Sequence, residues 1–368
     1  MRTLHRFTLQ EKVDFLRQPS SYSSRAPAVG AIETHFAWVF LTPRYAYKLK
    51  KPVRHVAMDY RSLAARRRGC LDEVRLNRRL APQVYLCVVP LRSRNGSLCL
   101  GGEGRIEDWL VKMHRLAPSC LLDRTLRHRA LRNPELERIV ARLAAFFAGA
   151  RRSPVSGEAY VRRLRREVAV NRNELTRAGS QIRQSLVQDV TRTQRAFIER
   201  AGPLLAERGA RVVEGHGDLR AEHVCLGPRP CVIDCLEFSR DLRLFDPLEE
   251  VAFLALEIER LGHRALAAQL LQRFQSASHN QGADPLVGFY LSHRAATRAK
   301  LAVWHLGDPQ FPDPRPWIGR ANSYLRDALR HGRRALRLLR HPAPGGAGIR
   351  FPDRRRTGSD AGARAEQR

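Results

Sequence analysis

Two aspartates in the middle of the chain each lie next to a short apolar segment, in an arrangement that could support phosphoryl transfer. Asp218 lies within residues 215–226 (Gly-His-Gly-Asp-Leu-Arg-Ala-Glu-His-Val-Cys-Leu), and Asp234 follows Val-Ile at 232–233. Between them, Gly-Pro-Arg-Pro at 227–230 indicates a turn, so a loop, a strand, a tight turn and a second strand are expected. The two carboxylates would then meet at neighbouring strand ends. One could orient or deprotonate an acceptor hydroxyl, and the other could hold the magnesium that bridges nucleotide phosphates.

The same segment resembles a known family. His-Gly-Asp at 216–218, a polar side chain five residues after the aspartate, and Ile-Asp at 233–234 are similar to the aminoglycoside phosphotransferase (APH) family, relatives of the protein kinases. The resemblance implies that Asp218 is the catalytic aspartate. It implies that Asp234, the counterpart of the aspartate in the kinase Asp-Phe-Gly motif, holds Mg²⁺. It also implies ATP or GTP as the phosphoryl donor and a small molecule with a hydroxyl group as the acceptor.

The similarity is greatest to an uncharacterised bacterial branch of that family, some of whose members carry a fused P-loop ATPase domain. The matching stretches are Glu-Thr-His at 33–35, Ala-Tyr-Lys-Leu-Lys-Lys-Pro at 46–52, Leu-Asn-Arg-Arg-Leu at 76–80 and Asp-Cys-Leu-Glu-Phe at 234–238. The resemblance covers about residues 30–330. It implies an α+β, protein kinase-like fold with two lobes, a small antiparallel sheet lobe and a larger, mainly helical lobe. It also suggests a separate P-loop ATPase as a candidate partner.

One position departs from the family pattern. The residue five after the catalytic aspartate is asparagine in most of the family, where its amide oxygen binds the metal, and here it is His223. Imidazole suits borderline metals such as zinc better than magnesium, which prefers oxygen ligands. His223 is therefore either a metal ligand or a structural histidine that donates a hydrogen bond in the loop, and Glu222 or Glu237 would compensate if His223 does not bind the metal.

Lysine is rare in this arginine-rich chain, yet three of its six lysines fall within residues 48–51. Residues 36–41 and 45–49 are predicted strands of a hairpin, and side-chain alternation places Lys48 and Lys50 on the same face. A compact ammonium on this strand can reach between two phosphates. By its match to the family pattern Lys48 takes this role, with Lys50 as the reserve. The alternative is a solvated basic edge strand.

Residues 62–80 have a helical pattern of apolar residues interleaved with arginines. Glu73 shares a stripe with Cys70, Asn77 and Leu80 at spacings of three and four, so it is expected to face inward. It resembles the helix glutamate that pairs with the strand lysine in kinase-like folds. The alternative is a partly solvated glutamate at the edge of the stripe.

Three more strands are predicted at 84–91, 97–100 and 109–113, the first two joined by an Asn-Gly hairpin turn. With the first hairpin they would complete an antiparallel sheet of about five strands flanked by one helix. Met113 and His114 fall at the end of the last strand, which looks like the hinge of a kinase-like fold. Their backbone groups would meet the base of the nucleotide.

Beyond residue 121 the chain is predicted to be mostly helical, at 133–151, 158–177, 181–208, 247–261, 265–278, 285–306 and 317–339. The expected organisation is an N-terminal helical extension at 1–24, the sheet lobe at 25–120, the helical lobe with the catalytic loop at 121–341, and a disordered basic tail at 342–368.

No run of about 18 apolar residues occurs, so no membrane span is expected. The first residues lack an apolar signal region, and a cytoplasmic location is therefore expected. Seven scattered cysteines form no Cys-x-x-Cys pair. They are interpreted as buried free thiols in a reducing compartment, because an odd, scattered set suits neither a disulfide framework nor a zinc ribbon.

The formal net charge of +30 would by itself suggest a nucleic-acid binder. The charge is spread along the chain, however, and few aromatic residues are available to stack bases, so a nucleic-acid partner is not expected. The positive charge also favours a neutral or anionic acceptor over a polycationic aminoglycoside, so antibiotic resistance is not the expected role.

Two alternatives to a phosphotransferase stay open. The first is a catalytically weak kinase-like scaffold that binds a nucleotide or a partner protein, motivated by His223 and by the lack of a glycine-rich phosphate loop. The second is an arginine-rich nucleic-acid binder that acts through the C-terminal helices.

Overall fold

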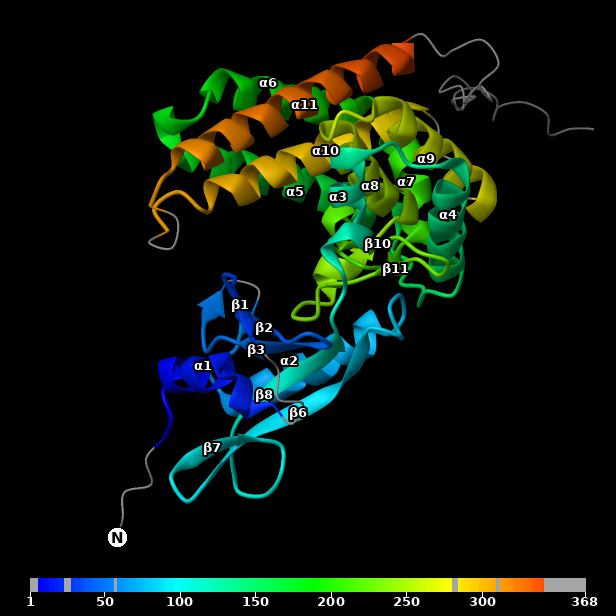
Figure 1. The fold of residues 1–368 in the computed structure, drawn as a ribbon. Helices are drawn as coiled ribbons and strands as arrows, with labels where there is room; N and C mark the ends of the chain where they lie inside the picture. The colour runs from blue at the N-terminus through cyan, green and yellow to red at the C-terminus, as the bar shows by residue number, and fades with distance from the viewer. Residues whose placement is uncertain (1–5, 23–27, 56–57, 280–283, 309–311, 341–368) are drawn as a thin grey trace, which may run out of the picture.

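The computed structural model describes residues 6–22, 28–55, 58–279, 284–308 and 312–340, which form two lobes (Figure 1). The first lobe is built on an antiparallel sheet, and the second is mainly helical. The predicted α+β architecture is thereby confirmed.

Six strands form the sheet in the spatial order β1-β2-β3-β8-β6-β7, and all neighbours are antiparallel. Their bounds are β1 (Gly30–Glu33), β2 (Ala37–Leu41), β3 (Tyr45–Lys50), β6 (Tyr85–Arg94), β7 (Ser97–Leu100) and β8 (Arg105–His114). The predicted Asn-Gly hairpin joins β6 to β7, and Asn95 and Gly96 have φ of 52° and 80°, as such a turn requires. Strand β1 was not predicted, because four mostly exposed residues carry no periodic apolar signal.

Different helices cover the two faces of the sheet. Helix α1 (Leu9–Arg17) packs against one face, in the same apolar cluster as Leu49 of β3. Helix α2 (Leu63–Asn77) packs in a separate apolar cluster on the other face. Because side chains alternate along β3, Lys48 and Lys50 point away from α1 and toward α2.

The helical lobe comprises α3 (Leu122–His128), α4 (Asn133–Ala148), α5 (Gly157–Arg177), α6 (Gln184–Arg200), α7 (Gly202–Glu207), α8 (Pro247–Arg260), α9 (Arg264–Ser278), α10 (Asp284–Val303) and α11 (Arg315–Arg340). The prediction of one continuous helix at 181–208 is wrong. The segment is split into α6 and α7 next to Pro203, a residue that cannot continue the hydrogen-bond ladder of a helix interior. None of the helices in the described part of the chain combines the length and apolar character that a membrane span needs.

Short elements complete the described fold. The two-residue strands are β4 (Arg54–His55), β5 (Met58–Asp59), β9 (Val213–Glu214), β10 (Val224–Cys225), β11 (Cys231–Val232) and β12 (Leu244–Phe245). The 3₁₀ turns are Pro19–Ser21, Pro118–Cys120, Gly179–Gln181, Arg208–Arg211, Ala221–His223 and Asp241–Arg243. Strands β10 and β11 form the predicted hairpin between the two aspartates.

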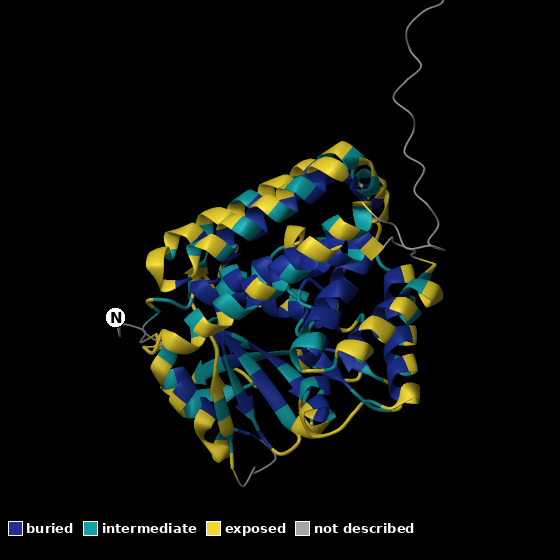
Figure 2. Ribbon diagram, turned by 90° about the horizontal axis from the view of Figure 1, so that it is seen from above, coloured by how far each residue is buried: buried dark blue, intermediate teal, exposed yellow. Residues whose placement is uncertain are grey.

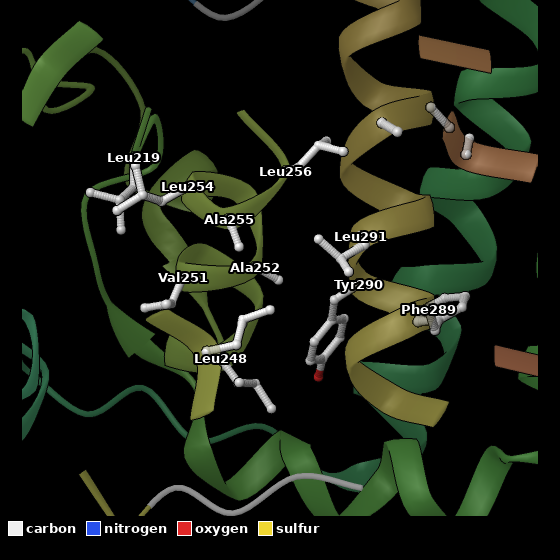
Figure 3. Packing of buried hydrophobic residues seen from close by; sticks show 14 of the residues in the cluster. Leu219, Leu248, Val251, Ala252, Leu254, Ala255, Leu256, Phe289, Tyr290 and Leu291 are labelled. Carbon is white, nitrogen blue, oxygen red and sulfur yellow. The ribbon is translucent and has the colours of Figure 1, made fainter. Parts of the chain in front are cut away.

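The segment that carries Asp218 is anchored in the core of the helical lobe. Leu219 is fully buried and lies beside Leu254 of α8, and Tyr290 of α10 faces α8 across the same cluster (Figure 3). Exposed residues lie mainly on the outer faces of the surrounding helices (Figure 2). Burying a leucine side chain stabilises a protein by about 1.5–3 kcal/mol. The residue next to Asp218 is therefore held firmly in place.

The prediction that all seven cysteines are buried free thiols is wrong. Cys120 and Cys225 form a disulfide, with their Cα atoms 5.1 Å apart. Leu121 pairs with Cys225 as an isolated bridge, and this places the two thiols side by side although 105 residues separate them. Among the free cysteines Cys87 is exposed. Sequence spacing could not reveal a pair that only the path of the chain brings together.

Candidate active site

The backbone of the loop at 215–218 is fixed by a buried glutamate. Glu250 on α8 accepts hydrogen bonds from the backbone N–H groups of His216 (2.7 Å) and Gly217. Burial raises the pKa of Glu250, although these two donors act in the opposite direction. Gly217 has a φ of +89°, and a Cβ atom there would press against the Leu242 carbonyl, so the position suits only glycine. The helical lobe thus sets the shape of the loop.

His216 joins this loop to the strand that carries Asp234. The fully buried ring donates from Nε2 to the carbonyl oxygen of Ile233 at 3.0 Å, and its Nδ1 accepts the backbone N–H of Asp218 at 3.3 Å. A proton on Nδ1 would face that N–H group, so the neutral tautomer is fixed. Burial is the main cause that lowers the pKa of His216 to about 3.

We therefore expect acidification to destabilise the protein through His216. Its pKa falls from 6.5 to about 3 on folding, so the unfolded chain binds this proton first. The stability that the neutral ring contributes is present above pH 6.5 and is lost as the pH falls toward 3. By pH 5 the loss through this residue should reach about 2 kcal/mol.

Denaturant unfolding at pH 7 and pH 5 measures this effect. The decrease in unfolding free energy should be smaller by that amount in His216→Gln, whose side chain does not titrate. An equal decrease in the wild type and in His216→Gln would show that His216 is not the responsible group.

Asp218 lies at the end of this loop, and its side chain is partly exposed. Arg220 donates from Nε to its Oδ2 at 3.0 Å, and Nη2 of Arg220 lies 2.9 Å from the same oxygen. The Asp218 side chain is 19% exposed. Burial alone would raise the pKa of Asp218, but the charges of Arg220 and Arg298 hold it below its ordinary value. The carboxylate is therefore ionised at neutral pH and able to accept a hydrogen bond from a hydroxyl group.

Asp234 follows β11 in a left-handed backbone conformation with φ +61°. Such a conformation is uncommon outside glycine and is held here by a hydrogen bond of 3.0 Å from the Asp234 N–H to the buried Tyr85 hydroxyl. The side chain is 47% exposed and accepts from the Lys48 ammonium at 2.8 Å. The charge of Lys48 is the main cause that lowers the pKa of Asp234.

Lys48, Lys50 and Glu73, which the sequence pattern singled out, form one cluster that contacts Asp234. The Lys48 ammonium lies 2.9 Å from Glu73 Oε1 as well as 2.8 Å from Asp234. The Lys50 ammonium lies 2.6 Å from Glu73 Oε2 and also binds Glu237. Glu73 is fully buried, so the expectation that it faces inward is confirmed and the solvated alternative is excluded.

The two lysines differ in what they can reach. Lys50 is enclosed, with 2% of its side chain exposed between Glu73 and Glu237. Lys48 has 17% exposed and contacts the more open Asp234. Lys48 is therefore the lysine with access to a ligand, and Lys50 is placed to hold Glu73.

His223 lies between the two aspartates. Its Nδ1–H donates to the Asp218 carbonyl oxygen at 2.8 Å, which is the loop hydrogen bond that the structural alternative predicts. Its Nε2 accepts from Arg220 at 3.1 Å and lies 3.7 Å from Asp234 Oδ2. Glu237, considered as a compensating ligand, is bound to Lys50 instead, and Glu222 pairs with Arg220.

The residues present fit a divalent ion of the kind that kinases use. The described segments hold no preassembled group of three or more acidic, histidine or cysteine side chains for a metal. Mg²⁺, however, is usually held by one or two carboxylates together with water and substrate phosphates. The half-exposed carboxylate of Asp234 can supply one ligand. His223 Nε2 accepts from Arg220, so it could bind a metal only if that hydrogen bond were broken. Its role as a metal ligand stays a prediction.

The expected hinge residues lie inside the sheet. Met113 and His114 end β8, the strand between β3 and β6, and the N–H of His114 donates to Val84 at 2.8 Å. The Met113 side chain is buried in the apolar cluster under α2. The prediction that backbone groups here meet the nucleotide base stays a prediction.

Several residues that shape the site were not found from the sequence as site residues. Glu250, Tyr85 and Arg220 each hold an aspartate or its loop through one or two contacts. Only Arg220 carries a local signal, because it lies two residues after Asp218. Nothing in the pattern around Glu250 or Tyr85 connects them with residues more than 30 positions away.

Comparison with known proteins shows the family to which the chain belongs. Residues 40–286 match the APH phosphotransferase enzyme family, and the chain belongs to that family. An uncharacterized protein of Mycobacterium tuberculosis and one of Mycobacterium bovis are each 31% identical to it over 283 residues, which is 75% of this chain. The chain spans only 55% of the length of these relatives.

Solved structures share the fold at low identity. A choline kinase from Cryptosporidium parvum has a TM-score of 0.54 and 11% identity, covering 89% of this chain and 96% of its own. The GDP complex of aminoglycoside 2'-phosphotransferase-IIIa has a TM-score of 0.52 and 12% identity, covering 88% of this chain and 99% of its own. The predicted protein kinase-like fold is thus confirmed.

Proposed function

We propose that this chain is a small-molecule kinase that transfers the γ-phosphoryl group of ATP or GTP to a hydroxyl group. The observation that carries the proposal is the position of Lys48. Its ammonium forms ion pairs with both Glu73 and Asp234. Asp234 lies 3.7 Å from His223, and the ring of His223 donates a hydrogen bond to the backbone of Asp218. Membership of a phosphotransferase family supports the same conclusion.

Each residue has a defined task in this proposal. Asp218 accepts the hydrogen bond of the acceptor hydroxyl and orients its oxygen for in-line attack. Lys48 moves from Asp234 to the nucleotide phosphates and offsets their charge, while Glu73 keeps it in place. Asp234, with His223, would hold Mg²⁺, which neutralises charge on the phosphates when bound. Lys50, which Glu237 holds in turn, keeps Glu73 in position.

The acceptor is proposed to be neutral or anionic. Arg220 binds the Asp218 carboxylate directly, and the buried guanidinium of Arg298 is close enough to lower the pKa of Asp218. Two guanidinium groups beside the reacting position disfavour a polycation. Efficient phosphorylation of kanamycin by the purified protein would contradict this part of the proposal.

Nucleotide binding can be tested by thermal shift with ATP and GTP, each with and without magnesium. A ligand that binds only the folded state should stabilise it by about 2.7 kcal/mol at 100 times its dissociation constant. We expect stabilisation that requires magnesium and that is lost in Asp234→Ala. The loss is expected because this change removes the carboxylate through which the metal would be held.

Asp72→Ala is the matched control, because Asp72 is a surface aspartate on α2 paired with the exposed Arg75. The control should keep the full shift. Absence of any shift in the wild type with either nucleotide would remove the kinase proposal. If Asp234→Ala keeps the magnesium-dependent shift, the protein binds nucleotide, but Asp234 does not hold the metal.

A kinase-like scaffold is the second candidate, and one observation favours it. Lys48 is paired with Asp234, and Asp218 is paired with Arg220, so both ends of the site are already occupied by protein groups. A scaffold would bind nucleotide without turning it over. Magnesium-dependent turnover that Asp218→Asn removes would exclude this candidate.

Two expectations about the wider protein stay predictions. A separate P-loop ATPase as partner remains a proposal, and the greater length of the mycobacterial relatives leaves room in them for a further domain. A cytoplasmic location is likewise proposed from the sequence. Co-purification of a second chain with the full-length protein would test the partner.

A further inference from the structure

A cavity lies next to β9, the strand that precedes the loop of Asp218. It has a volume of about 440 Å³ and opens between α2, α4 and β9. Four arginines, an aromatic ring and one glutamate supply most of its polar and aromatic lining: Arg75, Arg79, Arg142, Arg151, Phe146 and Glu214. None of the proposed catalytic residues lines it. No part of the proposed phosphoryl transfer uses this cavity.

The cavity carries surplus positive charge. Arg79 donates to the carbonyl oxygens of Leu76 (3.0 Å), Glu214 (2.8 Å) and Gly215 (2.7 Å), and these neutral partners leave its positive charge uncompensated. Arg142 donates to a carbonyl oxygen as well, that of Arg79 at 3.1 Å. Within the described segments, no carboxylate forms an ion pair with Arg79, Arg142 or Arg151.

The one carboxylate that lines the cavity is already compensated. Glu214 binds Arg243 at 2.7 Å and lies 3.6 Å from Arg240, outside the cavity lining. Burial alone would raise the pKa of Glu214, but the hydrogen bond and charge of Arg243 lower it on balance. Arg75 is the only lining arginine with an ion pair in the described part of the chain, to the exposed Asp72.

We propose that this cavity binds a small phosphorylated molecule. Guanidinium groups bind phosphate through two parallel N–H donors, and several of them converging on one hollow suit a ligand with two or more negative charges. The volume is in the range of ordinary ligand sites and larger than one phosphate group needs. The Phe146 ring, with Arg79 stacked 5.2 Å from its centre, offers an apolar wall for the rest of the ligand.

The position of Arg79 links the cavity to both aspartates. Its guanidinium holds the carbonyl groups of Glu214 and Gly215, which directly precede the His-Gly-Asp segment. It also contacts the thiol of Cys235, next to Asp234, at 3.3 Å. A ligand that binds Arg79 therefore changes the contacts that hold the loops of Asp218 and Asp234.

Isothermal titration calorimetry of the full chain with inorganic pyrophosphate tests the proposal. The titration contains EDTA and no nucleotide and is done at constant ionic strength, so its result does not depend on the proposed kinase activity. We expect saturable binding in the wild type. The affinity should fall by about tenfold or more for each guanidinium removed in Arg142→Gln, Arg151→Gln and the double variant. Arg79 is left intact because it braces the catalytic loop.

The matched control removes two arginines from a different hollow of equal volume. Arg172→Gln with Arg192→Gln alters a cavity of about 440 Å³ between α5 and α6 and should leave pyrophosphate affinity unchanged. Unfolding midpoints without ligand, compared among all variants, report whether each protein is folded. Loss of binding in a variant with an unchanged midpoint is the expected result.

Three outcomes of the titrations would overturn the proposal. They are no saturable binding in the wild type, equal binding by the wild type and the Arg142/Arg151 double variant, and equal weakening by the control pair, which would indicate a general effect of net charge. Random duplex DNA that binds more tightly than pyrophosphate, and that needs the same two arginines, would also overturn it by assigning the cavity to nucleic acid.

Discussion

Replacing Asp218 with asparagine will slow phosphoryl transfer by about 10²- to 10⁴-fold while nucleotide affinity changes little. The amide has the size of the carboxylate and can keep the hydrogen bond from Arg220 Nε to the side-chain oxygen, which is 3.0 Å long. It cannot accept a proton from the acceptor, and it no longer carries the charge that favours this role. Asp218 forms no contact with Lys48, so phosphate binding should survive the change.

The measurement is the rate of nucleotide hydrolysis, in which water replaces the unidentified acceptor, together with nucleotide affinity by thermal shift. Asp72→Asn serves as the control, because that carboxylate is on the surface of α2. Unchanged hydrolysis in Asp218→Asn would exclude Asp218 as the catalytic aspartate. A parallel loss of nucleotide affinity would instead assign Asp218 to binding.

Lys50→Met is expected to lower the free energy of unfolding by about 3–5 kcal/mol. The exposed fractions of the Lys50, Glu73 and Glu237 side chains are 2%, 0% and 9%. Burial alone would lower the pKa of Lys50, but the charges of Glu237 and Glu73 raise it on balance. Methionine fills a similar volume and leaves two buried carboxylates without their common cation.

Denaturant unfolding gives this free energy, and Lys48→Met is the matched comparison. Lys48 has more of its side chain exposed, and its partner Asp234 is 47% exposed, so water can replace that contact. Its other partner, the buried Glu73, keeps its ion pair with Lys50. We expect Lys48→Met to cost less stability and to lose nucleotide binding. If Lys50→Met costs no more than Lys48→Met, Lys50 is not the structural lysine.

A double variant checks the cause of the Lys50 effect. Glu237→Gln removes one of the two uncompensated charges, so Lys50→Met with Glu237→Gln should regain part of the stability lost in Lys50→Met alone. Additive losses from the two changes would indicate that packing, and not charge, accounts for the effect.

Local patterns in the sequence predicted most of the strands and helices, although they missed β1 and the break between α6 and α7. Alternation over residues 45–49 placed Lys48 and Lys50 on one face, and the spacing of three and four around Glu73 turned it inward. Both follow from the fixed periods of strand and helix, which act over a few residues. The His-Gly-Asp segment and its following hairpin were equally readable, because motif, turn and strands are contiguous.

The sequence by itself determined the family and the two-lobed fold, and it indicated the residues that we propose for phosphoryl transfer. The tertiary structure alone decided which distant groups complete them: Glu250 under the loop of Asp218, Tyr85 behind Asp234, and the disulfide between Cys120 and Cys225. It alone separated Lys48 from Lys50 by exposure and formed the arginine cavity. Side-chain periodicity reports which face a residue takes, whereas contacts across many residues depend on the path of the whole chain and on the charges that meet there.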